Sequence, residues 1–317
     1  MSDRLPPEVQ ALLDQRSAAR HVQDWTTADA LRDQLGELGW EPIDGPRGSW
    51  ARPRLPASPA PELVPLLDQP ATLAASVVLI GDEHGDDLAR FLAGMAAHQP
   101  IPLDWELLIV GNAPSYDLDL VLSAAAGQAA TVLPSPERLG WADAANLGLR
   151  HALGAVAVLV DTSLEPIGDW LTPLLAAFDD ATVGIAGPWG VNSANGREFA
   201  EAPPGEVDAV EAYCLAIRRD ALRAVGGGFD HRFRFYRNAD LDLSFAVRAA
   251  GWRAIRSQPL PLVRHEHRGY GSLPDDERER LSRRNFYRFL KHWGDRRDLL
   301  LHPAPRRGPH DAHDERD

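Results

Sequence analysis

The 317-residue sequence contains a single cysteine, Cys214, and a single lysine, Lys291. One cysteine excludes an intramolecular disulfide and cannot build a thiolate zinc site. No apolar stretch approaches the roughly 20 residues that a membrane-spanning helix needs. The start of the chain, over residues 1–16, is polar and acidic, unlike a secretory signal. We therefore expect a cytoplasmic protein that meets any membrane-bound substrate at the membrane surface.

Positive charge is in the minority, with 33 basic against 46 acidic residues and a net charge of -13. This balance argues against bulk binding of nucleic acid, and we expect no nucleic-acid partner. Almost all of the basic residues are arginines, whose guanidinium groups match two phosphate oxygens at once. A hydrophobic fraction of 44% is enough for a sizeable core, and the length suits one large domain plus a small one.

The chain divides into four zones. Residues 1–54 place apolar side chains at helical spacing in two short segments, which predicts a helical hairpin. Residues 55–73 are rich in proline and predict an extended linker. Residues 74–300 form the main domain, and the polar residues 301–317 are expected to be disordered.

The main domain alternates apolar strands with amphipathic helices. Leu88, Phe91, Leu92 and Met95 recur at helical spacing between two strands. This alternation predicts an α/β fold with a mostly parallel sheet flanked by helices, in which ligands bind beyond the carboxyl ends of the strands. The predicted strands cover Ser76–Ile80, Glu106–Val110, Ala155–Val160 and Val183–Gly187.

Three groups of polar residues follow these strands. Asp161 directly follows the strand ending at Val160, where a carboxylate can hold a divalent ion against a diphosphate. Asp240 and Asp242 precede a predicted helix, where a carboxylate can act as a general base or simply favour the helix N-terminus. His265 and His267 occupy alternate positions after a later strand and could hold metal or phosphate.

Taken in order, these groups resemble the motifs of family 2 glycosyltransferases over about residues 74–294. The resemblance rests on seven segments in the family's order rather than on any one of them. They are Ser76–Ile80, Gly111-Asn112, Leu139–Leu149, Asp161-Thr162-Ser163, Cys214–Arg219 with Gly227–Asp230, Ala239–Ser244, and His265. The resemblance implies a GT-A (Rossmann-like) fold and transfer of a sugar from a nucleoside-diphosphate sugar to an acceptor hydroxyl, with inversion.

The resemblance also implies residue roles. Asp240 would be the catalytic base, and Asp161 with His265 would hold Mg or Mn against the diphosphate. Arg219 and Asp242 would lie on the acceptor side. The nucleotide sugar would be contacted by Asn112, Gly140, Asn146 and Asp161.

Three positions depart from the family's pattern. Gly111 replaces an aspartate that contacts the base, Ser163 replaces the second carboxylate of the metal motif, and Ala239 replaces the glutamate before Asp240. A catalytically degenerate relative that binds a nucleotide or a partner is therefore an alternative. The acceptor class stays open between glycan, lipid-linked and protein acceptors.

Residues 12–50 resemble a second family, the C-terminal tail of cysteinyl-tRNA synthetases, through segments such as Ala28–Leu35. An adaptor that meets RNA through this hairpin is a further alternative, although residues 1–54 hold nine acidic residues against seven arginines. Residues 278–297 are strongly basic with an apolar side. That basic side is either a solvated helix face or a contact for a diphosphate-linked acceptor or an anionic membrane.

Overall fold

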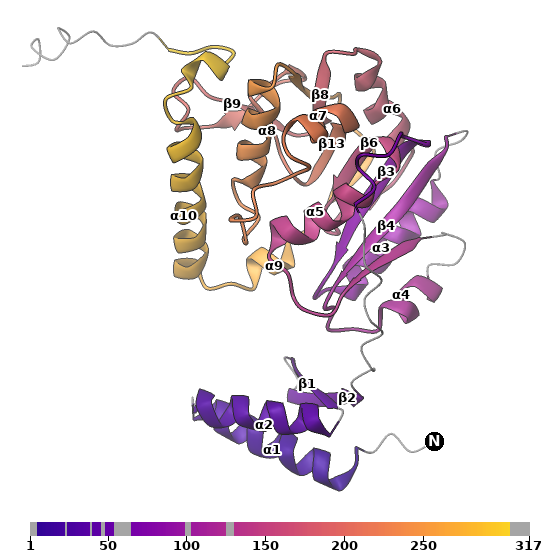
Figure 1. The fold of residues 1–317 in the computed structure, drawn as a ribbon, viewed down its shortest axis with the longest axis vertical. Coiled ribbons are helices and arrows are strands. Elements are labelled where there is room, and N and C mark those ends of the chain that lie inside the picture. Colours follow the sequence, from indigo (N-terminus) through magenta and orange to yellow (C-terminus); the bar gives the residue numbers. More distant parts are fainter. Residues whose placement is uncertain are drawn as a thin grey trace, which may run out of the picture. The chain divides into compact units, whose positions relative to one another are not determined.

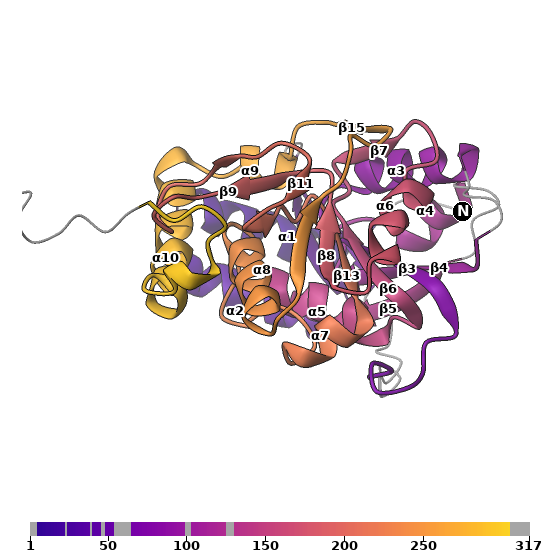
Figure 2. The same ribbon diagram turned by 90° about the horizontal axis from the view of Figure 1, so that it is seen from above.

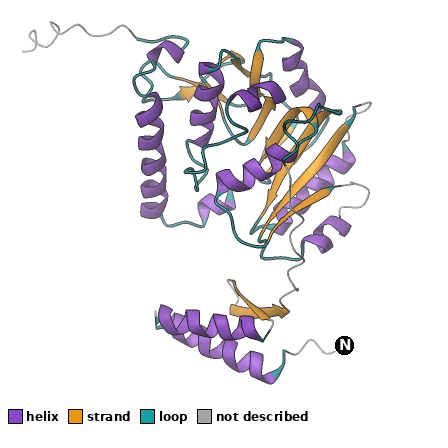
Figure 3. Cartoon of the chain, in the orientation of Figure 1, coloured by secondary structure: helices purple, strands orange, loops and turns teal. Residues whose placement is uncertain are grey.

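A computed structural model describes residues 5–22, 24–38, 40–45, 48–53, 65–98, 103–124 and 130–304. The chain forms two compact units, Met1–Glu62 and Leu63–Asp317 (Figure 1). Figure 3 shows that the smaller unit combines helices with two strands, whereas the larger unit is built around a sheet. No helix among these residues is long and apolar enough to cross a membrane.

The smaller unit contains the predicted helical hairpin and a β-hairpin that was not predicted. Helices α1 (Pro7–His21) and α2 (Trp25–Glu37) are followed by antiparallel strands β1 (Trp40–Gly45) and β2 (Gly48–Pro53). Asp24 caps α2 by accepting a hydrogen bond from the Thr27 amide at 3.1 Å. Val9, Leu13, Leu35 and Ala51 form a small core, so the second hairpin completes the burial that two helices alone could not provide.

The larger unit contains an eight-stranded sheet with the order β11-β14-β8-β13-β6-β3-β4-β5. Strands β3, β4, β5 and β6 run parallel, β13 runs antiparallel between β6 and β8, and β14 is parallel to β8. The sheet is mostly parallel, as predicted, with β13 and β11 reversed. Its strands are β3 (Leu73–Gly81), β4 (Trp105–Asn112), β5 (Thr131–Ser135), β6 (Gly154–Val160), β8 (Val183–Gly187), β11 (Gly205–Glu206), β13 (Cys214–Arg218) and β14 (Arg253–Arg256).

Helices cover both faces of this sheet because its central strands bury side chains on both sides (Figure 2). One core joins the sheet to α5 (Trp141–His151), α7 (Arg219–Ala224) and α8 (Ala239–Ala249). The other joins it to α3 (Gly85–Ala97) and α6 (Leu171–Leu175). The remaining elements of this body are α4 (Leu118–Ala124), η1 (Ala176–Asp179), the pair β7 (Leu164–Pro166) and β15 (Leu262–Arg264), and the small sheet of β9 (Gly190–Asn192), β10 (Ala200–Glu201) and β12 (Ala209–Val210).

The C-terminal helix α10 (Asp275–Trp293) stands beside α8 at one end of the unit (Figure 1). Its Phe289 is fully buried and meets Phe245 of α8 with ring centroids 5.0 Å apart. Phe286, Leu290 and Trp293 join the same cluster, which confirms the apolar side expected for this segment. The short helices α9 (Arg268–Gly271) and η2 (Arg297–Leu299) flank α10.

Two predicted boundaries shift in the structure. Leu66 and Leu67, in the predicted linker, belong to the larger unit: the Leu66 amide donates to Arg150 O at 2.7 Å, and Leu67 is buried in the core. Leu301 and Ala304, at the start of the predicted disordered tail, are hydrogen bonded to Asp208 and Ala194. Residues 54–64 and 305–317 lie outside the described part of the chain.

Candidate active site

A cavity of about 460 Å³ lies beyond the carboxyl ends of β3, β4 and β6. Asp82 follows β3, Asn112 ends β4 and Asp161 follows β6, and all three line the cavity. The chain runs outward from β3 to β4 and β5, and then crosses to β6 on the opposite side of β3. The cavity therefore lies at the topological switch point, where ligands bind in open α/β sheets.

Asp161 and His267 form an ion pair in the cavity wall. His267 Nε2 lies 3.1 Å from Asp161 Oδ2, and the Ser163 amide donates to Asp161 Oδ1 at 2.8 Å. The amide of Asp161 donates to Tyr213 O at 2.9 Å. Both oxygens of the Asp161 side chain are thereby fixed in position at the end of β6.

The contact between Asp161 and His267 shifts the pKa of each side chain toward its charged form. Burial raises the pKa of Asp161, but the hydrogen bond and charge of His267, together with the hydrogen bonds from Ser163, outweigh it, and the net shift is downward. Burial lowers the pKa of His267, but Asp161 outweighs it, and the net shift is upward. His267 Nδ1 accepts a hydrogen bond from the Tyr270 amide at 3.1 Å, so the proton of the neutral ring lies on Nε2.

Ser163 supplies a buried hydroxyl beside the Asp161 carboxylate. The residue is 3% exposed and lines the cavity, and among the described residues its Oγ interacts with Asp161 alone, an interaction that helps to lower the pKa of Asp161. A hydroxyl beside a buried carboxylate at the end of β6 can join it in binding a cation. The oxygens of Asp161 and Ser163 with the nitrogen of His267 fit a Mg or Mn ion.

His265 does not lie with Asp161. Its Nε2 is 2.6 Å from Glu165 Oε2, and its amide donates to Ser163 O at 2.9 Å. The expected pairing of His265 with Asp161 is therefore replaced by His267. The two histidines are two residues apart after β15, and the path of the chain after that strand decides which one reaches the cavity.

Asp240 lies in the first turn of α8, behind the cavity wall. Its Oδ2 accepts from the Ala212 amide at 3.2 Å and its Oδ1 from the Leu241 amide at 3.0 Å. Ala212 lines the cavity, which places Asp240 next to it. Burial raises the pKa of Asp240 more than these hydrogen bonds lower it, and burial together with the charge of Asp240 raises the pKa of Glu211.

The side-chain amides of Asn112 and Asn146 form hydrogen bonds with backbone groups of other segments. Asn112 Oδ1 accepts from Leu139 N at 2.7 Å and its Nδ2 donates to Leu139 O at 3.3 Å. Asn146 makes the same pair of bonds with Phe229, each at 2.7 Å. Gly140 makes room for Arg234, since a Cβ there would lie 3.0–3.1 Å from its Cα, Cβ and Cγ. Of these three expected nucleotide-binding residues, Asn112 lines the cavity, Gly140 packs against Arg234 of its wall, and Asn146 lies outside its lining.

Arg219 is a buried structural residue and does not line the cavity. Its side chain is 4% exposed and donates to the carbonyls of Leu66, Gln69 and Ala152, with Nη2 to Gln69 O at 2.9 Å. The guanidinium of Arg219 links α7 to the segment before β3. The expected role of Arg219 on the acceptor side therefore has no geometric support.

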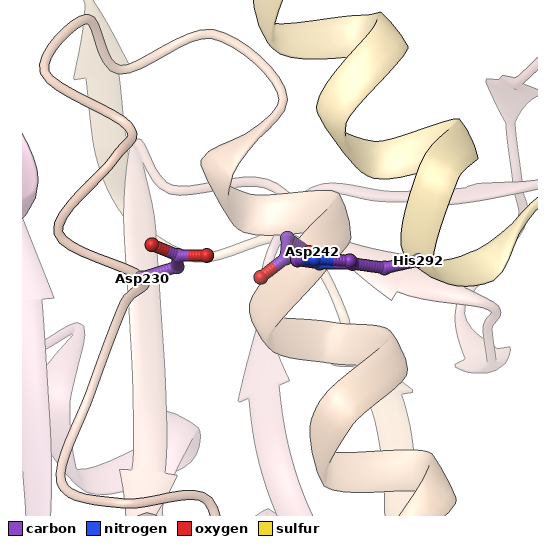
Figure 4. A group of neighbouring side chains, drawn as sticks. All are labelled: Asp230, Asp242 and His292. Atoms are coloured by element: carbon purple, nitrogen blue, oxygen red, sulfur yellow. The ribbon is translucent and has the colours of Figure 1, made fainter.

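Asp242 lies outside the cavity lining, in a cluster with Asp230 and His292 (Figure 4). One ligand atom from each of the three lies within 4.8 Å of the others, which would suit a metal ion. However, Trp293 Nε1 donates to Asp242 Oδ1 at 2.8 Å, and Arg232 Nε donates to Asp230 Oδ2 at 2.8 Å. A guanidinium already neutralises Asp230, so these contacts stabilise the packing of α10 on α8 instead.

Sequence reasoning did not single out the aromatic and basic side chains of the cavity wall. The ring of Tyr236 stacks on His267 with centroids 4.7 Å apart and planes 14° apart. Arg234 and Arg284 also line the cavity. Tyr236 and Arg234 lie in an irregular loop before α8. This loop has neither a hydrophobic periodicity nor a sequence motif that would mark its residues as part of a site.

A three-layer α/β unit with a cavity at its switch point has the architecture of GT-A glycosyltransferases. The model of the family described as "Glycosyl transferase family 2" matches residues 78–259, more than half of the 317 residues. The chain belongs to this family. A second model, "Cysteinyl-tRNA ligase anticodon binding domain", matches residues 2–40.

Solved and curated proteins show the same two likenesses. The structure of GalNAc-T7 with UDP, GalNAc and Mn²⁺ aligns with a TM-score of 0.58 at 16% identity, over 71% of this chain and 49% of that one. Cysteine–tRNA ligases of Escherichia coli and Shigella boydii are 50% identical over 46 residues, 14% of this chain. The chain spans a tenth of the length of these curated relatives and about half of GalNAc-T7.

Proposed function

We propose that this chain transfers a sugar from a nucleoside-diphosphate sugar to an acceptor hydroxyl. The observation that carries this proposal is the set of Asp161, Ser163 and His267 in the wall of the switch-point cavity. The Ser163 hydroxyl and the fixed Asp161 carboxylate beside it are oxygen groups that a nucleotide-bound cation would use. Membership of the glycosyltransferase family supports the same reaction.

Asp161, Ser163 and His267 would hold Mg or Mn, and this ion would neutralise the diphosphate as it leaves. To bind a metal through Nε2 as a neutral ring, His267 would need its proton on Nδ1, so the hydrogen bond from the Tyr270 amide to Nδ1 would have to be broken. The Ser163 amide keeps the Asp161 carboxylate oriented, since it donates to Oδ1. Tyr236 limits the movement of the His267 ring by stacking on it.

Asp240 would act as the general base. In this step the acceptor hydroxyl gives its proton to Asp240, its oxygen bonds to the anomeric carbon, and the bond from that carbon to the diphosphate oxygen breaks. A single displacement of this kind inverts the anomeric configuration. Burial raises the pKa of Asp240, which brings it closer to the working pH and makes it a stronger base than an exposed aspartate.

The test is turnover of nucleotide sugars in the presence and absence of Mn, beginning with uridine and guanosine diphosphate sugars. Release of the nucleoside diphosphate should require metal, and Asp240→Asn should reduce it by about 100-fold or more. Nucleotide binding without turnover in the wild type would instead support a catalytically degenerate member of the family. The matched control is Asp169→Asn, because Asp169 lies near α6 and outside the cavity lining.

A further inference from the structure

The charged side chains of the cavity wall are mostly paired with each other. Arg268 Nε donates to Asp87 Oδ2 at 2.8 Å, and Arg138 forms an ion pair with Glu83. His267 is paired with Asp161. These pairs cancel each other's charge locally, as expected in a protein whose net charge is -13.

Arg234 and Arg284 are the exceptions. Both are exposed side chains that line the cavity, and neither side chain has a hydrogen bond or ion pair within the described residues. The hydrogen bond from Arg280, with Nε at 3.0 Å, is the main cause of the lowered pKa of Glu277, and the charge of Arg284 has only a smaller effect on this carboxylate. The cavity therefore carries two cations that the protein itself leaves without an anion.

The two arginines are held on one wall by a buried asparagine. Asn285 of α10 is fully buried, and its Nδ2 donates to Phe235 O at 2.6 Å and to Arg237 O at 2.9 Å. Arg284 precedes Asn285 and Arg234 precedes Phe235, so this contact ties the two positions together. An exposed guanidinium that lines a cavity without a carboxylate partner is suited to binding an anionic group there.

Arg234 and Arg284 belong to other elements than the proposed metal-binding set. They come from the loop before α8 and from helix α10, and no hydrogen bond or ion pair among the described residues joins either of them to Asp161, Ser163 or His267. The diphosphate of the donor would lie at Asp161, which leaves the second substrate as the ligand of the two arginines.

We infer that Arg234 and Arg284 bind a phosphate group on the acceptor, so that the acceptor hydroxyl belongs to a phosphate monoester. This inference rests on the proposed function. The planar guanidinium groups match the oxygens of a phosphate, and two of them can neutralise its charge. Leu273 and Leu281 line the same cavity, so the phosphate monoester could be either a soluble molecule or the head group of a lipid.

The test measures phosphate binding to the full chain, with nucleotide binding titrated separately. The soluble probe is glycerol 3-phosphate, with glycerol as its neutral counterpart, added in the presence of saturating nucleoside diphosphate and Mn. The lipid probe is phosphatidylcholine vesicles with and without phosphatidic acid. The variants are Arg234→Gln and Arg284→Gln. The matched control is Arg197→Gln, since Arg197 is also exposed without a side-chain partner but does not line the cavity.

We expect each cavity variant to weaken phosphate binding by about tenfold and to leave nucleotide affinity unchanged, while the control variant changes neither. Binding of glycerol 3-phosphate would identify a soluble acceptor, and binding only of vesicles that contain phosphatidic acid would identify a lipid-borne one. The inference is overturned if neither probe binds, if Arg197→Gln has the same effect, or if the cavity variants weaken nucleotide binding instead. A chain that binds no nucleotide contradicts the proposed function, and the phosphate titration without nucleotide then still tests the two arginines.

Discussion

At the scale of single residues, buried amide side chains connect separate segments of the fold. Asn146 joins α5 to Phe229 through two hydrogen bonds, and its side chain is 5% exposed. Asn146→Ala should lower the free energy of unfolding by about 2–4 kcal/mol, because it leaves a buried N–H and C=O unpaired. Urea unfolding measures this cost. A variant with wild-type stability but lost nucleotide affinity would show that Asn146 contacts the nucleotide directly.

The pair of Asp161 and His267 makes stability depend on pH. The pKa of His267 lies above its ordinary value of 6.5, so its protonation stabilises the folded state. This contribution is fully present below about pH 6.5 and is lost as pH rises through the raised pKa. The difference in unfolding free energy between wild type and His267→Gln, measured without metal between about pH 5 and pH 9, should therefore shrink as pH rises. A difference that grows with pH contradicts the ion pair.

At the scale of elements, α5 lies unusually close to the sheet. A Cβ at Gly148 would stand 2.2 Å from Val78 Cγ1 of β3 and 3.2 Å from Val110 Cγ2 of β4. Gly148→Ala should destabilise the fold by about 1–3 kcal/mol. Adding Val78→Ala removes the clashing methyl groups and should recover part of the loss, as thermal unfolding of the single and double variants would reveal. Equal stability of Gly148→Ala and wild type would mean that α5 moves freely.

Much of the element order follows from the sequence, because buried parallel strands are continuous apolar runs. Val183–Gly187 was predicted with its observed bounds, and the other predicted strands differ from the observed ones by one to three residues at an end. Strands β5, β13 and β14 and the β1–β2 hairpin were not predicted. β13 is a short apolar run, which periodicity cannot distinguish from a buried helical segment, and β1 and β2 contain glycine and proline, which usually mark turns. The choice between His265 and His267 depends on a bend after β15 that no local pattern records.

At the scale of the whole molecule, the division into two units has a consequence for truncation. Deletion of residues 1–62 removes one compact unit and should leave the cavity intact. Deletion of residues 1–70 also removes the carbonyls of Leu66 and Gln69, and leaves the buried guanidinium of Arg219 without these partners. The longer deletion should therefore lower the melting temperature strongly, and the shorter one only slightly. Similar melting temperatures for both truncations would show that residues 63–70 are not part of the larger unit.

The central claim is that Asp161, Ser163 and His267 form a metal-dependent nucleotide site, and thermal shift in the presence of nucleoside diphosphates tests it most directly. A ligand that binds only the folded state raises the melting temperature once its concentration exceeds its dissociation constant. We expect one nucleoside diphosphate to raise the melting temperature of the wild type, more strongly with Mn, and to have no effect on Asp161→Ala. A shift that is the same without Mn and in Asp161→Ala, or no shift with any nucleotide, would contradict the claim.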